Sequence, residues 1–146
     1  MGVAVSKTVL YKSIEEVPYL RDFSRLYAYI LKEEPVQRYI TLFDHITDLN
    51  TEDVAGWLNI TPKTYRSYRK NPELTLKDNL KEHLIVILSL YRHGMDVFGS
   101  RELFEKWLTT PNVLLDQKAP RQFLDTISGV KFIDNRLTAL EFGENV

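Results

Sequence analysis

The sequence predicts an all-α fold, and three observations lead to that prediction. Glycine and proline are scarce, at six residues each, and long stretches of the chain are built from leucine, lysine, glutamate and tyrosine. Apolar residues recur at spacings of three, four and seven, as on one face of a helix. No segment alternates apolar and polar residues convincingly, so no strand is expected.

Two helices are expected on either side of Pro35. Residues 19–34 follow a proline and keep the helical spacing, with apolar positions at Leu20, Phe23, Tyr27, Ile30 and Leu31. Pro35 ends this helix and can occupy the first turn of the next. The second helix has one apolar face, formed by Val36, Tyr39, Ile40, Phe43 and Ile46. Residues 1–14 show no clear period and are expected to form a short arm.

A short helix, a tight turn and a second helix are expected next. Thr51 is the expected N-cap of the first, and two acidic residues follow it in the turn where the helix dipole favours them. The apolar residues of this helix are Val54, Ala55, Trp57 and Leu58. Residues 59–61 form the turn, and Thr61 caps a helix in which Pro62 takes the first position.

A long helix and a shorter one are expected after the P-E-L-T loop. Thr75 with Asp78 resembles a capping box at the start of the long helix. This helix is lined by Leu80, Leu84, Ile87, Leu88 and Tyr91. Ser100 is expected to cap the shorter helix, which stops before Pro111 because proline cannot continue it.

The last two expected helices meet near Gly129. Pro120 opens the first of them, and Gly129 is expected to supply its left-handed stop. The final helix is expected over about residues 130–142, with apolar positions at Phe132, Ile133, Leu137, Leu140 and Phe142.

The helix over residues 62–70 has a docked face and a basic face. On a helical wheel, at about 100° per residue, Tyr65 and Tyr68 fall on one side. The other side shows the three cations Lys63, Arg66 and Lys70 and the hydroxyl of Ser67. Arg69 lies on the flank, where it could reach a phosphate. With Thr64 from the same helix, the predicted DNA-binding residues are Lys63, Thr64, Arg66, Ser67, Arg69 and Lys70.

This anatomy is typical of a helix-turn-helix, in which the second helix enters the major groove of DNA. Cations neutralise phosphates, and arginine, lysine and serine can also bond to base edges. The alternative is a solvated basic surface helix, which is a common feature. The short helix and the tight turn that come before it favour the DNA-binding interpretation.

Composition excludes several classes of protein. A formal net charge of −1 excludes a protein that coats nucleic acid over its whole surface, but leaves room for a local basic patch. The absence of cysteine excludes disulfides, cysteine zinc sites and a thiol nucleophile. No apolar run approaches the roughly 18 residues of a membrane span. The apolar stretch at the start of the sequence is too short for a signal peptide. We therefore expect a cytoplasmic protein without membrane contact.

No catalytic or metal-binding constellation is expected, and the chain is predicted not to be an enzyme and to need no cofactor. The histidines His45, His83 and His93 are scattered, without a second metal ligand at helical spacing. Ser89, His93 and Asp96 lie close in sequence, but a triad needs the right geometry and an oxyanion site. Without a glycine-rich elbow or phosphate loop, these three are interpreted as helix-surface residues.

The stretch W-L-T-T-P-N, residues 107–112, has a structural role to fill. Trp107 and Leu108 end a helix under apolar cover, Pro111 blocks its continuation, and Asn112 can bond the freed backbone groups. Trp107 therefore fits a core position better than a partner contact.

The last turn of the chain is more ambiguous. Leu140, Phe142 and Val146 lie at or beyond the final helix, on a tail too short to bury them easily. Packing back onto the protein and contact with a partner explain them equally well.

The motifs also carry a family resemblance. L-N-T-E-D-V-A-G-W-L-N-I-T-P-K-T-Y-R-S-Y-R-K is followed by a leucine-rich helix and H-G-M-D-V-F-G. Next come W-L-T-T-P-N, A-P-R-Q-F-L-D-T-I-S-G and L-T-A-L-E-F-G. Over about residues 40–143 this order resembles the Xre/MbcA/ParS antitoxin family, most specifically its C-terminal toxin-binding domain. Asp116 and Gln117 depart from the pattern, because the family usually has a glycine-rich turn there.

The resemblance implies a type II antitoxin. Such proteins bind and silence a partner toxin, commonly a RES-type enzyme that consumes NAD or transfers ADP-ribose from it. They also bind their own promoter DNA, usually as homodimers with half-sites about one helical turn apart. The implied organisation is an N-terminal arm and helix over 1–34, a DNA-binding domain over 35–94 and a toxin-binding domain over 95–146.

Toxin contacts are expected from the W-L-T-T-P-N region and from the acidic, apolar tip of the chain. A toxin that uses NAD must recognise a diphosphate, so its pocket is expected to hold cationic or amide donors for the acidic groups of the tip. The predicted toxin-binding residues are Trp107, Pro111, Asn112, Leu115, Leu140, Glu141, Phe142, Glu144 and Val146.

Two other functions remain open at the level of sequence. One is a stand-alone helix-turn-helix transcription regulator whose C-terminal domain only dimerises. The other is a small-molecule-binding or enzymatic helical domain, which the lack of a polar pocket signature disfavours. The neighbouring reading frame distinguishes them, because a toxin-like enzyme there favours the antitoxin.

Overall fold

The computed structural model describes residues 14–71, 73–75 and 77–143. Within these residues the protein is all-α, as predicted, with an isolated antiparallel bridge between Asn112 and Lys118 and no named strand. The α-helices are α2 (Phe23–Leu31), α3 (Val36–Ile46), α4 (Thr51–Trp57), α5 (Pro62–Lys70), α6 (Asp78–Phe98), α7 (Arg101–Thr109) and α8 (Ile127–Glu141). Two 3-10 helices, η1 (Val113–Leu115) and η2 (Pro120–Phe123), lie between α7 and α8.

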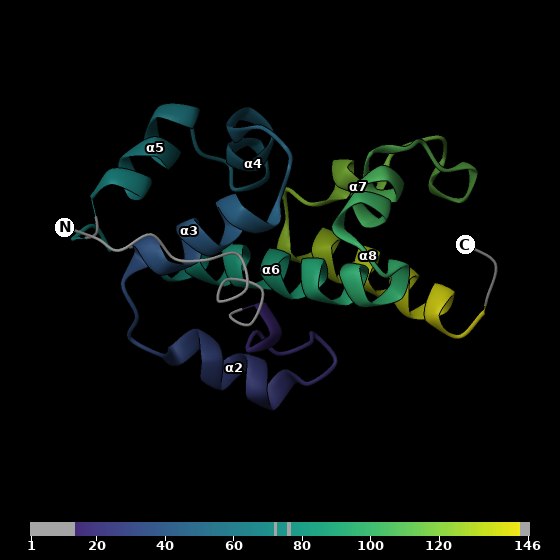
Figure 1. Cartoon of the computed structure of the whole chain (residues 1–146), viewed down its shortest axis with the longest axis horizontal. Coiled ribbons are helices and arrows are strands. Elements are labelled where there is room, and N and C mark those ends of the chain that lie inside the picture. Colours follow the sequence, from purple (N-terminus) through teal and green to yellow (C-terminus); the bar gives the residue numbers. More distant parts are fainter. Residues whose placement is uncertain (1–13, 72, 76, 144–146) are drawn as a thin grey trace.

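Helix α6 runs through the centre of the molecule (Figure 1) and contacts α2, α3, α7 and α8. A helix that is apolar nearly all round is buried, and α6 fits this rule. Its fully or almost fully buried apolar residues are Leu84, Ile85, Val86, Ile87, Leu88, Leu90 and Tyr91. The helices on both sides of α6 therefore share one hydrophobic core.

Aromatic side chains connect the two ends of this core. Phe43 of α3 lies edge-on to Trp57 of α4 and to Tyr91 of α6, with ring centroids 6.4 and 5.6 Å apart. Tyr91 is in turn edge-on to Phe104 of α7 at 5.0 Å. Edge-to-face pairs at these distances add to the energy of burial, so α3, α4, α6 and α7 are held as one unit.

A buried carboxylate joins α7 to the end of α3. Glu105 accepts hydrogen bonds from the hydroxyls of Tyr91 and Thr47, at 2.7 and 2.9 Å. It also accepts one from the backbone N–H of Asp48 at 3.0 Å. Three donors compensate for the cost of burying the charge. The loop that leads into α4 is thereby fixed to α7.

We expect Glu105→Gln to lower the free energy of unfolding by about 1–2 kcal/mol, because an amide cannot accept from all these donors and brings two donors of its own. Urea denaturation measures this loss. Glu102→Gln is the matched control on the same helix, since the side chain of Glu102 is 69% exposed and surface ion pairs contribute little. Equal losses in the two variants would contradict the structural role of Glu105.

Two helix starts differ from the sequence prediction. The N-cap of α4 is Asn50, whose Oδ1 accepts from the N–H of Asp53 at 2.9 Å, so Thr51 is the first helical residue and not the cap. Helix α6 begins at Asp78 behind Lys77, whose side chain makes no capping bond. The capping box expected from Thr75 is therefore wrong, because Thr75 lies two residues before the actual cap position.

Gly129 has a different role from the one predicted. It lies in the first turn of α8, and its N–H donates to the hydroxyl of Thr126, the N-cap. A Cβ at this position would lie 1.7 Å from the carbonyl oxygen of Phe123. Glycine is thus required by a close approach of two backbones and not by a left-handed stop. The final helix accordingly starts at Ile127, earlier than expected.

The segment before α2 is attached to α6 by hydrogen bonds. The Arg92 guanidinium donates to the carbonyl of Val17 at 2.6 Å and lies over the Tyr19 ring. Ser89 donates to the carbonyl of Pro18 at 2.7 Å, and the Tyr19 hydroxyl donates to Asp96. The first described residues therefore belong to the folded unit.

Candidate nucleic-acid and partner interfaces

Helices α4 and α5 are joined by a tight turn, as predicted. Asn59 has a φ of 57°, in the left-handed region that asparagine tolerates. The N–H of Ile60 donates to the carbonyl of Ala55 at 3.1 Å and closes α4. Thr61 then caps α5 by accepting from the N–H of Thr64 at 3.1 Å, with Pro62 in the first position. Local bonds thus define this connection, and the Asn59 side chain also donates to the distant carbonyl of Asp125 at 2.9 Å.

Asp44 of α3 fixes the orientation of α5. Tyr65 is fully buried and donates to Asp44 at 2.8 Å. Arg69 forms a two-point pair with the same carboxylate, at 2.7 and 3.0 Å. Burial, together with the nearby charge of Asp44, raises the pKa of Tyr65 well above its ordinary value, so the phenol keeps its proton. Arg69, predicted to reach a phosphate from the flank, holds α5 in place through this pair, and its side chain is still 39% exposed.

The outward face of α5 presents cations to solvent. Lys63, Arg66 and Lys70 are exposed, while Thr64 and Ser67 are half-buried. The Ser67 hydroxyl donates to the carbonyl of Lys63 at 3.1 Å. Arg66 lies 3.3 Å from Glu52 of α4, and both side chains are largely exposed. A pair of this kind is weak in water, so Arg66 remains able to exchange Glu52 for another anion.

The W-L-T-T-P-N stretch closes α7 as the sequence suggested. Trp107 is half-buried, with its ring 5.6 Å from that of Phe98 and 6.3 Å from that of Phe104. Helix α7 ends at Thr109, before Pro111. The side chain of Asn112 accepts from the N–H of Leu114 at 2.9 Å and starts the next turn. The core interpretation of Trp107 describes its position well.

The loop after this turn has the conformation that glycine favours, although it contains none. Asp116 and Gln117 have φ angles of 58° and 64°. The N–H of Gln117 donates to the carbonyl of Asn112, and the N–H of Asn112 donates to the carbonyl of Lys118, both at 3.0 Å. These bonds hold two consecutive residues in the left-handed region at some cost in strain. The sequence departs from the glycine-rich turn of the family at Asp116 and Gln117, but their backbone has the left-handed conformation that glycine would adopt.

Residues 93–143 match the family model of the antitoxin Xre/MbcA/ParS C-terminal toxin-binding domain. The resemblance inferred from the sequence is confirmed over this segment, which runs from the last turns of α6 to the end of α8. The match supports an antitoxin role in a toxin-antitoxin system. No curated protein matches the chain. Within the described residues, no helix is long and apolar enough to cross a bilayer.

The predicted toxin-binding residues occupy different environments in the toxin-binding domain. Phe142 is 75% exposed and Pro111 is also at the surface, whereas Leu115 is buried. Trp107, Asn112 and Leu140 are half-buried. Glu144 and Val146 lie outside the described residues. Leu115 is therefore a core residue of the matched segment, whereas its neighbours Val113 and Leu114 are exposed.

Sequence reasoning missed three exposed apolar residues of this domain. Leu103 of α7 is 54% exposed, and Val113 and Leu114 of η1 are 70% and 52% exposed. In a 3-10 turn, consecutive side chains point about 120° apart, so three adjacent apolar residues cannot all be buried. The run V-L-L was the available signal, but only the fold decides which of its members faces inward.

His93 is the centre of a buried polar cluster. Its Nδ1 lies 2.8 Å from Asp134 and its Nε2 lies 3.1 Å from Glu141, both on α8. Tyr19 covers the ring edge-on at 6.0 Å, and Arg21 reaches Glu141 at 3.4 Å. Burial alone would lower the pKa of His93, but the two carboxylates outweigh it and raise the pKa above its ordinary value.

This cluster corrects one interpretation drawn from the sequence. His93 and Ser89 are buried and not on the helix surface as expected. Their partners come from α8 and from the segment before α2, which the sequence does not place beside them. Glu141, predicted to meet the toxin, is already bonded to His93 and Arg21.

We expect His93 to make the protein less stable at alkaline than at mildly acidic pH. Because its folded pKa is raised, its contribution is fully present below the unfolded value of about 6.5 and is lost as pH rises through the folded value. Thermal unfolding of the wild type and of His93→Gln at pH 6 and pH 8.5 measures this. The stability gap between the two proteins should be larger at pH 6. An equal gap at both pH values would show that His93 is not protonated in the native state.

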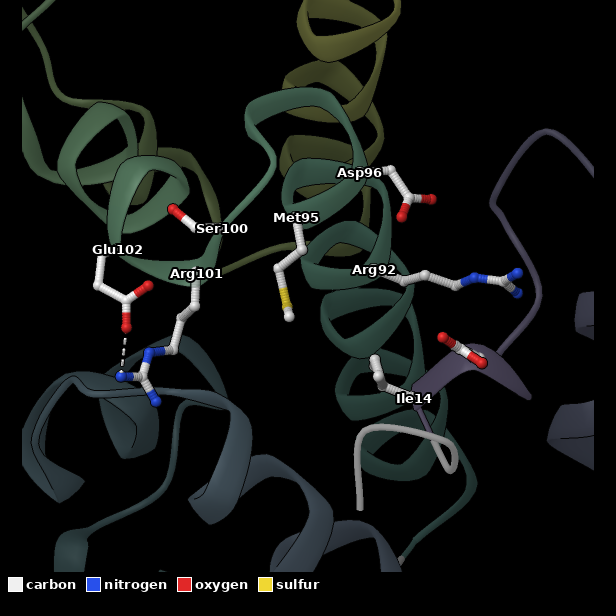
Figure 2. A pocket seen from close by; sticks show the side chains of 8 residues that line it. Ile14, Arg92, Met95, Asp96, Ser100, Arg101 and Glu102 are labelled. Atoms are coloured by element: carbon white, nitrogen blue, oxygen red, sulfur yellow. Dashed lines mark hydrogen bonds and ion pairs between the residues drawn. The ribbon is translucent and has the colours of Figure 1, made fainter. Parts of the chain in front are cut away.

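A hollow of about 400 Å³ lies between α6, the start of α7 and the segment at Ile14 (Figure 2). Most of its charged side chains make contacts within the chain. Arg92 holds the Val17 carbonyl, Asp96 accepts from Tyr19, and Arg101 pairs with Glu102 at 2.8 Å. No group of three or more potential metal ligands is found among the described residues. The contacts of Arg92 and Asp96 connect α6 to the segment before α2.

Proposed function

We propose that this protein is a type II antitoxin that binds and neutralises a partner toxin and represses its own promoter. The observation that carries the proposal is the match of residues 93–143 to a toxin-binding domain. We assign toxin binding to residues 95–146, DNA binding to residues 35–94 and an accessory role to residues 1–34. Helix α6 contacts elements of both larger parts, so the two activities share one core.

The toxin-binding surface is proposed to combine exposed apolar side chains with the acidic tip. Phe142, Leu103, Val113 and Leu114 are exposed apolar residues in the matched segment, where a partner could bury them. The family resemblance implies a RES-type toxin that uses NAD. Acidic groups near the end of the chain suit the cationic or amide donors that a diphosphate pocket needs.

The DNA-binding part is proposed to be a helix-turn-helix with α5 as its recognition helix. Its tight turn, its docking through Tyr65 and its exposed Lys63, Arg66 and Lys70 support this role. Glu52 beside Arg66 is compatible with base contact, since a carboxylate can accept from cytosine. A homodimer would bring two such helices to a symmetric operator.

Co-expression with the product of the neighbouring reading frame tests the proposal. We expect the two proteins to co-purify and the complex to consume less NAD than the isolated partner. The matched control replaces Lys63, Arg66 and Lys70 by alanine and should still capture the partner. Operator binding without any captured partner would instead favour a stand-alone transcription regulator.

A further inference from the structure

Residues 14–22, which we call the N-terminal segment, fold against the second half of α6. Ile14 and Val17 are buried in the core, and the N–H of Val17 donates to the carbonyl of Ile14 at 3.0 Å. Figure 2 shows Arg92 extending from α6 toward this segment, where its guanidinium donates to the carbonyl of Val17 at 2.6 Å. The N-terminal segment is therefore a fixed part of the fold, although it lies outside the stretch that matches the toxin-binding family model.

Tyr19 is the central contact of the N-terminal segment. Its hydroxyl donates to Asp96, and its ring lies edge-on to that of His93 with the centroids 6.0 Å apart. The guanidinium carbons of Arg92 and Arg21 lie 4.1 and 4.3 Å from the centroid of the same tyrosine ring. Cations at this distance are attracted to the face of an aromatic ring. The Tyr19 ring therefore restricts the position of the Arg21 side chain.

Arg21 and His93 meet at Glu141, the last residue of α8. One carboxylate oxygen of Glu141 lies 3.4 Å from Nη1 of Arg21 and 3.1 Å from Nε2 of His93. The next residue, Phe142, is 75% exposed, and its N–H donates to the carbonyl of Thr138 at 3.1 Å. Because Phe142 follows Glu141 directly, the two contacts on the carboxylate also restrain the turn that carries Phe142.

We propose that Tyr19 and Arg21 are positioning residues for toxin binding, because through Glu141 they keep the last turn of α8 and Phe142 in one orientation. The inference rests on the proposed function for the assignment of Phe142 as a toxin contact. Helix ends open more readily than the core of a fold. A side chain that is ordered before binding loses less conformational freedom on association and binds more tightly. The N-terminal segment therefore acts on toxin binding through α8 and not by direct contact.

The expected effect is moderate, because the pair between Arg21 and Glu141 is partly in solvent. The two side chains are 53% and 36% exposed, and ion pairs at the surface contribute little by themselves. Two features strengthen this pair. The Tyr19 ring restricts the arginine, so less freedom is lost when the pair forms. His93 contacts the same carboxylate and is itself fixed by Asp134, which lies 2.8 Å from its Nδ1. We therefore expect changes of about threefold when the arginine is replaced.

Hydrogen exchange of the free protein, followed by NMR, tests the positioning without any toxin. Arg21→Gln should speed the exchange of the amides in the last turn of α8, residues 138–142, by about threefold. Arg21→Lys keeps the charge and should exchange as the wild type does. The matched control is Arg25→Gln, at a side chain that is 82% exposed and pairs with Asp22, and it should also leave these amides unchanged. In a Glu141→Gln background, Arg21→Gln should have no further effect, because the pair is already broken. Wild-type exchange in Arg21→Gln, or equal acceleration in Arg21→Lys, would overturn the proposal.

The same variants measure the consequence for toxin binding. With the product of the neighbouring reading frame as toxin, Arg21→Gln should raise the concentration needed for half inhibition by about threefold. Arg21→Lys and Arg25→Gln should inhibit as the wild type does, and operator affinity should be the same in all of them. Full inhibition by Arg21→Gln would refute the role in toxin binding. A wild type that fails to inhibit would instead refute the proposed function, whereas the exchange experiment would still decide whether Arg21 holds the end of α8.

Discussion

Replacing Lys63, Arg66 and Lys70 together by alanine is expected to lower operator affinity by roughly 100- to 1,000-fold. Each phosphate contact favours binding because it releases counterions from the DNA, and this gain is lost with the contact. An arginine that reads a base contributes about 1–3 kcal/mol to binding. The slope of the logarithm of affinity against that of salt concentration should also fall, by about one for each lost contact in each copy. Fluorescence anisotropy at several salt concentrations measures both quantities.

The fold of this variant is expected to stay intact. The contacts that dock α5, from Tyr65 and Arg69 to Asp44, do not involve the three replaced side chains. Lys106→Ala, on the exposed surface of α7, is the matched control and should bind the operator as the wild type does. Arg66→Ala alone separates the two kinds of contact, because a base contact changes sequence preference and a phosphate contact weakens all sequences alike. Wild-type affinity in the folded triple variant would exclude α5 as the recognition helix.

Phe142→Ala is expected to weaken toxin inhibition by about 2 kcal/mol or more, roughly 30-fold. Aromatic side chains that enter a desolvated pocket are frequent hot spots, and Phe142 is 75% exposed. The proposed pocket is the apolar mouth of the toxin's active site. The measurement is a paired assay of NAD consumption by the toxin and of operator binding by the same variant.

The structure also determines which C-terminal residues should be deleted to test their role in toxin inhibition. Deleting residues 140–146 would also remove Glu141 and its bond to His93, so a loss of inhibition would be mixed with a loss of stability. Deleting residues 142–146 keeps that bond and is the cleaner variant. Leu74→Ala, at an exposed apolar residue outside the matched domain, is the control. Full inhibition after the shorter deletion would move the inhibitory surface to Leu103, Val113 and Leu114.

Local signals in the sequence were sufficient for part of the local structure, although the caps of α4 and α6 were predicted wrongly. Thr61 and Ser100 cap their helices as predicted, because capping joins groups only three residues apart. The wheel of residues 62–70 separated the buried Tyr65 from the exposed cations, because the period of a helix fixes which side chains share a face. The family resemblance likewise rested on short motifs that can be read along the chain.

Other features were missed because a contact with another segment decides the role of the residue. Gly129 was taken for a helix stop, but it is required by the Phe123 carbonyl, which approaches across a turn. The ion pair between Arg69 and Asp44 was not predicted, because Asp44 lies 25 residues away in the sequence. The burial of Leu115 was not predicted either, since periodicity cannot decide which of three adjacent apolar residues faces the core.

The sequence by itself determined the helical class, the tight connection between α4 and α5, the basic face of α5 and the family resemblance of the C-terminal segment. Each of these depends on the order of residues within one or two helical turns. Only the tertiary structure decided that His93 is buried between two carboxylates, that Glu105 is buried among hydrogen-bond donors, that Phe142 is exposed and that α2 exposes apolar side chains. Burial and pairing depend on which helix faces pack against α6. The spacing of residues along one helix shows which side chains share a face, but not which other helix covers that face.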